Sequence, residues 1–253
     1  MTISATADKR MLIDGKLVDA RSGLEFDNVN PFTEQVLGQV ADADTSDMDE
    51  AIGAARTAFD GSRWATDRAF RKACLLQLQA GIEAEREALR AELVAEVGSP
   101  IALTYGPQLD TPLGEVIPWV VDHVDEFDWE RDLSIGTAFG KRSWRSVFKE
   151  PVGVVGAIVP WNFPFEVTLA KTAQALITGN TVIIKPVPDT PFNATRLGRI
   201  VAEHTDIPPG VVNVVTTSDN EVSSMLVTDP RVDLISFTGS TAVGRFISGP
   251  RGR

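Results

Sequence analysis

The second half of the chain alternates short apolar runs with amphipathic stretches. The apolar runs occupy 152–159, 181–185, 211–215 and 234–237, and the segments between them have helical spacing at 165–177, 191–204 and 220–227. Gly, Asn or Pro stands near the ends of several of these segments. Strands that alternate with helices in this way form a parallel sheet covered on both faces. The pattern therefore predicts an α/β fold with flanking helices.

The first half predicts antiparallel strands followed by long helices. Asp14-Gly15 lies between two apolar runs in 11–20, which is a strong hairpin signal, and 35–41 has the pattern of a further strand. Ser46 is a candidate N-cap for the first helix. A helical repeat then continues from 66 to 97 and ends at Gly98, and a third helical pattern spans 110–129. The acidic side chains around that third pattern predict a solvated helix face.

Residues 139–151 differ in character from their surroundings. Basic and apolar residues alternate there, namely Lys141, Arg142, Trp144, Arg145, Val147, Phe148 and Lys149. Basic residues interleaved with aromatic ones are typical of single-stranded nucleic-acid binding. The segment is short and the chain is acidic, so we favour a ribbon used for contact between subunits.

Composition narrows the function classes. The 253 residues include 24 Lys and Arg against 35 Asp and Glu, a net charge of −11, which disfavours a general nucleic-acid partner. No window of eighteen uninterrupted apolar residues exists, and 1–10 has no apolar signal-peptide core. One cysteine and two histidines do not suffice for a standard zinc site. We expect a cytoplasmic protein with no membrane partner and no metal.

Three polar segments follow predicted strands. Ligands of parallel sheets bind at the carboxyl ends of the strands, so 160–162, 185–186 and 238–240 are expected on one rim. The turn at Gly239-Ser240 precedes a helix, where free N–H groups and the helix dipole favour an anion. Lys185 could bind a phosphate or a sugar hydroxyl, and Asn162 could donate to an oxyanion. The alternatives are a plain turn, a solvated lysine and a helix-capping asparagine.

No complete catalytic motif is present in the sequence. The glycine spacing of 239–244 matches a P-loop, but Arg245 and Phe246 stand where that loop needs Lys and Ser or Thr, which disfavours a nucleotide triphosphatase. Cys74 falls among core-spaced residues of a predicted helix without a nearby histidine. We therefore expect a packed structural thiol rather than a nucleophile.

Several motifs together resemble the aldehyde dehydrogenase family. In chain order they are Asn-Pro-Phe-Thr at 30–33, Glu-Pro-Val-Gly-Val-Val-Gly at 150–156, Pro-Trp-Asn-Phe-Pro at 160–164, Lys-Pro at 185–186, Pro-Pro-Gly-Val-Val-Asn at 208–213 and Phe-Thr-Gly-Ser-Thr at 237–241. Their order and spacing are similar to those of the family, up to about residue 246. The resemblance implies the Rossmann-like N-terminal part of that fold. Its expected divisions are 1–138 (N-terminal strands and helices), 139–151 (an oligomerisation ribbon) and 152–253 (dinucleotide-binding βαβ units).

The resemblance also implies the residues of a site for NAD or NADP. Asn162 matches the asparagine of the family's oxyanion hole. The cofactor-binding positions are Ile158, Pro160 and Trp161 at the nicotinamide, Lys185 at the adenosine ribose, Gly210 at the adenine, and Phe237, Gly239, Ser240 and Val243 at the pyrophosphate turn. Pro188 stands where many NAD-preferring members carry a glutamate on the ribose, so NADP is not excluded.

The implied reaction is oxidation of an aldehyde to a carboxylic acid. In the family a cysteine thiolate attacks the aldehyde, hydride passes to NAD(P)+, and a glutamate-activated water hydrolyses the thioester. Both residues follow the Gly239 turn in the family, beyond the end of this sequence. We therefore expect a truncated chain that is inactive alone. The alternatives are a non-catalytic dinucleotide-binding remnant and an interaction module that pairs through 139–151 with a full-length relative.

Overall fold

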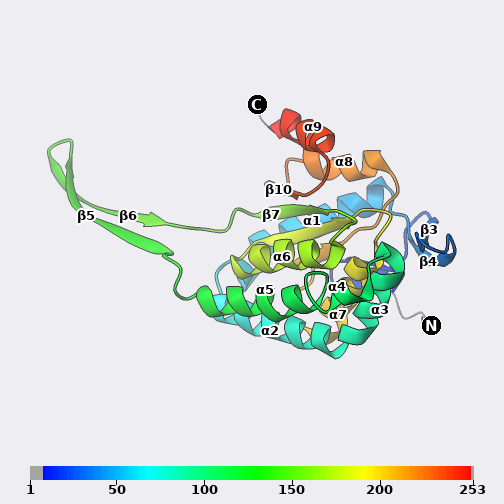
Figure 1. Ribbon diagram of the computed structural model, residues 1–253. Coiled ribbons are helices and arrows are strands. Elements are labelled where there is room, and N and C mark those ends of the chain that lie inside the picture. The colour runs from blue at the N-terminus through cyan, green and yellow to red at the C-terminus, as the bar shows by residue number, and fades with distance from the viewer. Residues whose placement is uncertain (1–7, 252–253) are drawn as a thin grey trace.

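The computed structural model describes residues 8–251 and has a six-stranded sheet at its centre (Figure 1). The strand order is β10 (Leu234–Phe237), β7 (Val154–Val159), β8 (Thr181–Pro186), β9 (Val212–Val214), β1 (Met11–Ile13) and β2 (Lys16–Val18). The first four of these are parallel, whereas β1 is antiparallel to both β9 and β2. The predicted parallel sheet and the predicted hairpin at Asp14-Gly15 are both confirmed.

Helices cover both faces of this sheet. On one face lie α1 (Thr45–Gly61) and α8 (Asn220–Thr228). On the other lie α6 (Pro164–Ile177) and α7 (Phe192–His204), with α2 (Arg68–Ala84), α3 (Arg86–Val97) and α5 (Asp110–His123) packed outside them (Figure 1). The shorter elements are the 3-10 turn Arg63–Ala65 and α4 (Ile101–Thr104), and α9 (Thr241–Arg251) follows β10. No helix within 8–251 is both long and apolar enough to cross a bilayer.

Strand β8 shows why the apolar runs have no polar alternation. Val182 and Ile184 join the core beneath α6 and α7, whereas Ile183 joins the core beneath α1 and α8. Successive side chains of a strand point to opposite faces, so a strand covered on both faces must be apolar throughout. Because β8 lies between β7 and β9, its carboxyl end, with Lys185, lies in the middle of the parallel part of the sheet.

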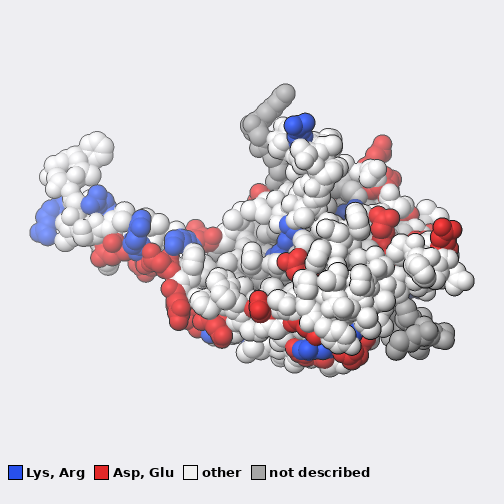
Figure 2. Space-filling model, viewed as in Figure 1, with Lys and Arg blue, Asp and Glu red and all other residues white. Residues whose placement is uncertain are grey.

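Two antiparallel pairs stand apart from the central sheet. One is β3 (Glu25–Val29) with β4 (Val36–Ala41), and the other is β5 (Glu130–Ala138) with β6 (Lys141–Phe148). The second pair projects from the body as a ribbon (Figure 1). Its first strand lies wholly before residue 139, so the ribbon is longer than the segment 139–151. Figure 2 shows basic side chains along the projecting ribbon and acidic ones where it joins the body.

Helix α1 begins earlier than the sequence pattern predicted. Its N-cap is Asp44, whose carboxylate accepts hydrogen bonds from the N–H groups of Ser46 and Asp47 at 2.7 and 3.1 Å. The Asp47 carboxylate accepts from the Asp44 N–H in return, at 3.1 Å. Together these three hydrogen bonds satisfy the N–H groups of Asp44, Ser46 and Asp47 at the start of the helix. The prediction of Ser46 as the cap is therefore wrong.

The long repeats also end differently. The pattern over 66–97 is two helices, because Glu85 leaves the helical conformation (φ −108°, ψ 12°) between α2 and α3. There the Glu85 carboxylate reaches the guanidinium groups of Arg196 and Arg199 on α7. The third pattern, 110–129, stops being helical after His123. The contacts of Glu85 with α7 are not encoded in the apolar spacing of the sequence.

Candidate functional site

A groove of about 910 Å³ opens at the carboxyl ends of β7, β8 and β10. All the predicted site residues except Gly210 line it, which brings together Ile158, Pro160, Trp161, Asn162, Lys185, Pro188, Phe237, Gly239, Ser240 and Val243. These residues come from three segments separated by more than twenty positions in the chain. The parallel sheet aligns the ends of its strands and so gathers them at one edge.

The turn after β10 forms one wall of the groove. At Gly239 an added Cβ would lie 2.5 Å from the Phe237 ring, so a larger residue would require that ring to move. Ser240 precedes α9, and its hydroxyl oxygen accepts a hydrogen bond from the Val243 N–H at 3.3 Å. The N-terminus of α9 therefore faces the groove with the partial positive charge of a helix start, which favours an anion.

Lys185 is a buried cation that lines the same groove from β8, which β7 separates from β10 in the sheet. It lies near the end of β8, is 8% exposed, and has no hydrogen-bond or ion-pair partner within residues 8–251. Burial lowers the pKa of its ammonium to about 8, and the Asp189 carboxylate acts in the opposite direction. A buried charge without a partner destabilises the folded chain. A bound anion that pairs with Lys185 would offset this cost, so the groove favours an anion at this position.

A hydrogen bond fixes the backbone of Asn162, whereas its side-chain amide has no such bond in the described part of the chain. Its carbonyl oxygen accepts a hydrogen bond at 2.8 Å from the side chain of Gln108, which is 3% exposed. The N-cap of α6 is Phe163 and carries no side-chain cap bond, so Asn162 does not cap this helix. With no hydrogen bond on its side chain in the described part of the chain, the Asn162 amide is free to donate.

Part of the groove lining was not predicted from the sequence. It comes from α8 and α9, with Asn220, Ser223, Ser224, Val227, Ala242, Phe246 and Ile247, and Val187 follows β8. The hydroxyls of Ser223 and Ser224 donate to the carbonyl oxygens of Asp219 and Asn220, at 2.9 and 2.7 Å. No local motif marks these residues, because only the packing of α8 on α9 brings them to the groove.

The structure does not bring Gly210 into the groove. Its φ of +80° and its position beneath α1 both require glycine, since an added Cβ would lie 2.5 Å from the Ala54 carbonyl oxygen. Close packing of a turn against α1 thus accounts for this glycine. An adenine contact at Gly210, which the family resemblance implies, stays a prediction.

Cys74 has the properties of a structural thiol, as predicted. It is fully buried on α2, and burial raises the pKa of its thiol to about 11. A thiolate nucleophile needs a lowered pKa and access to the substrate. Cys74 has neither property and does not line the groove.

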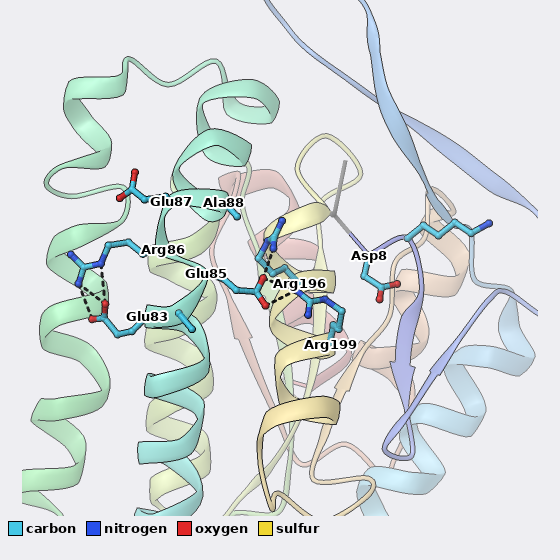
Figure 3. A pocket seen from close by; sticks show the side chains of 10 residues that line it. Asp8, Glu83, Glu85, Arg86, Glu87, Ala88, Arg196 and Arg199 are labelled. Atoms are coloured by element: carbon cyan, nitrogen blue, oxygen red, sulfur yellow. Dashed lines mark hydrogen bonds and ion pairs between the residues drawn. The ribbon is translucent and has the colours of Figure 1, made fainter. Parts of the chain in front are cut away.

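A second cavity, of about 870 Å³, lies at the junction of α2 and α3 (Figure 3). Two arginines of α7 line it, but both are already paired. Arg196 donates to Glu92 at 2.7 Å and also contacts Glu85, and Arg199 donates to Glu85 at 2.7 Å. Because these carboxylates neutralise the guanidinium groups, this cavity has much less attraction for an anion than the groove.

Comparison with known proteins decides the family. The profile of the aldehyde dehydrogenase family matches residues 17–250. The chain belongs to this family. It is 36% identical over 246 residues to an aminoacetaldehyde dehydrogenase of Pseudomonas aeruginosa, covering 96% of this chain and 48% of that protein. It is 34% identical over 245 residues to the NADP/NAD-dependent aldehyde dehydrogenase PuuC of Escherichia coli, covering 96% and 48%. The chain thus spans about half the length of these relatives.

Solved structures of aldehyde dehydrogenases share this fold. An apo betaine aldehyde dehydrogenase of Staphylococcus aureus superposes with a TM-score of 0.91 at 28% identity, over 99% of this chain and 49% of that one. An indole-3-acetaldehyde dehydrogenase of P. syringae in complex with NAD+ gives 0.89 at 31% identity, over 99% and 50%. Aldehyde dehydrogenases use NAD(P)+, and the groove fits such a group: among residues 8–251 its lining offers a buried unpaired lysine, a helix N-terminus and no acidic residue.

Proposed function

We propose that this chain is the dinucleotide-binding part of an enzyme that oxidises an aldehyde to a carboxylic acid with NAD(P)+. One observation carries the proposal: Lys185, buried without a partner, lines the same groove as the N-terminus of α9. Lys185 and the Gly239-Ser240 turn bind the anionic dinucleotide, while Ile158, Pro160 and Trp161 line the groove on the side of β7. The bound dinucleotide supplies a hydride acceptor.

Asn162 has the catalytic role within this chain. Its amide donates to the carbonyl oxygen of the aldehyde as negative charge develops on it, and Gln108 holds the Asn162 backbone in place for this. The nucleophile and the general base are the cysteine and the glutamate that the family resemblance implies. Cys74, the single cysteine, is buried away from the groove, so a reactive thiolate must come from outside these 253 residues.

Turnover and binding can be separated in the purified chain. We expect no aldehyde-dependent absorbance rise at 340 nm, because the nucleophile and its base are essential to the chemistry. We expect dinucleotide binding to persist in calorimetry and to weaken in Ser240→Asp, where a carboxylate meets the cofactor phosphates; Ser46→Asp adds the same charge on α1 as a control. Aldehyde oxidation that survives Cys74→Ala, or dinucleotide affinity that Ser240→Asp leaves unchanged, would contradict the proposal.

A second proposed function is association with another chain through the ribbon. Its exposed aromatic side chains support this: Phe139 in the turn between β5 and β6, and Trp144 and Phe148 on β6, are at least 65% exposed. Exposed apolar surface of this kind is typical of interaction sites. We expect light scattering to give a mass above 27.3 kDa for the chain, and Trp144→Ser with Phe148→Ser to restore the monomer. If the unsubstituted chain is a monomer, self-association through the ribbon is excluded. Light scattering of a mixture with a full-length relative would then test whether the ribbon pairs with that relative instead.

A further inference from the structure

The projecting ribbon has two faces of different character. Successive residues of a strand point to opposite sides, and residues that pair directly across two antiparallel strands share a side. One face, which we call the aromatic face, consists of four cross-strand pairs: Thr137 with Arg142, Ile135 with Trp144, Asp132 with Ser146, and Glu130 with Phe148. Lys141, Ser143, Arg145 and Val147 belong to the other face.

The other face is partly covered by the ribbon itself. Arg145 donates a hydrogen bond to the carbonyl oxygen of Leu133 at 3.3 Å. An added Cβ at Gly136 would lie 2.6 Å from the guanidinium carbon of Arg145, so the glycine leaves room for the guanidinium to lie across β5. The aromatic face has no such internal cover.

The aromatic face presents a row of apolar side chains to solvent. Ile135, Trp144 and Phe148 are 57%, 75% and 65% exposed. The indole N–H of Trp144 donates to the Asp132 carboxylate at 2.9 Å, which fixes the ring on this face. An exposed apolar row that is held in place in this way is typical of a surface that contacts another protein.

Opposite charges stand at the two ends of this row. Arg142 lies at the outer end, is exposed, and makes neither a hydrogen bond nor an ion pair within residues 8–251, whereas Asp132 and Glu130 lie at the inner end, where the ribbon joins the body (Figure 2). They are four to six strand positions away, roughly 13–20 Å at the usual rise of a strand. This exceeds the screening length of about 8 Å at physiological salt, so these charges do not neutralise each other within one chain.

A second copy of the chain supplies the missing partners. A two-fold axis near Trp144 brings Arg142 of each copy to Asp132 and Glu130 of the other, and the apolar rows meet between these charges. A parallel arrangement would place like charges together, which is unfavourable. A nucleic acid fits less well, because two carboxylates of the same face and a net charge of −11 repel its phosphates.

We propose that two copies of this chain associate through their aromatic faces in an antiparallel arrangement, with Arg142 of each copy paired to Asp132 and Glu130 of the other. This inference rests on the self-association of the ribbon proposed above. It adds which face is used, how the two copies are oriented and which ion pairs set that orientation. The apolar row supplies most of the affinity, because exposed ion pairs contribute little to it.

The test is sedimentation equilibrium of the 253-residue chain at low salt, which gives the dissociation constant of the dimer. Arg142→Glu should raise this constant about tenfold or more, because like charges then face each other. Lys141→Glu is the matched control: it makes the same charge change at the next residue, on the other face, and should raise the constant by less than about threefold.

A charge exchange tests the pairing itself. Glu130→Arg alone should also weaken the dimer, because it places a second cation beside Arg142 of the other copy. An equimolar mixture of Arg142→Glu and Glu130→Arg should associate more tightly than either variant does alone, because opposite charges meet again at both contacts. High salt should reduce all of these differences.

The outcomes separate this inference from the self-association beneath it. Equal effects of Arg142→Glu and Lys141→Glu, or a mixture that associates no better than its components, would leave the dimer in place and overturn the arrangement. If the unsubstituted chain is a monomer, the self-association fails and this inference fails with it. Binding of a single-stranded oligonucleotide that Arg142→Glu abolishes would then assign the aromatic face to nucleic acid.

Discussion

Two buried cations on neighbouring elements have opposite surroundings. Arg196 on α7 is 3% exposed and pairs with Glu92 and Glu85, and although burial opposes it, these carboxylates raise the pKa of its guanidinium. Lys185 on β8 is 8% exposed and has no such partner in the part of the chain that the structure describes, and burial lowers its pKa to about 8. The first cation joins helices to one another, whereas the second faces a groove. A buried charge that the fold leaves unpaired therefore indicates a ligand site more clearly than a buried charge that the fold neutralises.

The largest expected effect is on the paired cation. Arg196→Met leaves Glu92, itself 4% exposed, as an uncompensated buried carboxylate. Breaking a buried pair in this way costs about 3–5 kcal/mol of unfolding free energy. Urea denaturation at pH 7 measures it, with Arg131→Met, at an exposed position of β5, as a variant expected to behave like wild type. If Arg196→Met had the same urea midpoint as wild type, the ion pairs of Arg196 would contribute little to the free energy of unfolding.

The unpaired cation should respond in the opposite direction. Because burial disfavours the charged form of Lys185, Lys185→Met should raise the unfolding free energy at pH 7 by about 1–3 kcal/mol, provided that the methionine packs without strain. Destabilisation of similar size would show that the ammonium has a structural partner after all.

The same lysine predicts a pH dependence. Its pKa is about 8 in the folded chain and about 10.4 when unfolded. Between these values the unfolded state binds more protons, so this group's contribution to stability rises with pH. The advantage of Lys185→Met over wild type should therefore shrink between pH 8 and 10.5. Urea midpoints of both proteins across this range measure the difference, which would stay constant if Lys185 had an ordinary pKa.

The smallest expected effect on the free energy of unfolding comes from the helix cap Asp44, whose carboxylate is hydrogen-bonded near the surface. The Asp44 carboxylate accepts two N–H hydrogen bonds at the start of α1, so Asp44→Ala should cost about 1 kcal/mol of unfolding free energy. Ser46→Ala, two residues later, is the matched control and should change it by less than about 0.5 kcal/mol. Equal effects from the two variants would restore Ser46 as a cap.

Local patterns predicted the elements that carry the site. The strands of the sheet, the hairpin at Asp14-Gly15 and the rim that holds Asn162, Lys185 and Ser240 all follow from apolar runs and turn residues close together in the sequence. The rim was predictable because a parallel sheet has only one edge where the carboxyl ends of its strands meet.

Contacts between distant segments could not be predicted in this way. Gln108 reaches Asn162 across 54 positions, and Glu85 reaches Arg196 across 111. The wall that α8 contributes to the groove and the packing of Gly210 under α1 depend equally on how helices sit on the sheet. In each case the tertiary contact, rather than residue spacing, determines the role.

Lys185 is a buried cation without a partner among residues 8–251, and we propose that an anionic dinucleotide neutralises it. The most direct measurement is the pKa of its ammonium by NMR of isotopically labelled lysine, with the signal assigned through Lys185→Met. We predict a titration near pH 8 in the free chain and a pKa raised on addition of NADP+, because a bound phosphate stabilises the charged form. A titration near the ordinary value of about 10.4, or one that saturating NADP+ does not move, would contradict the account.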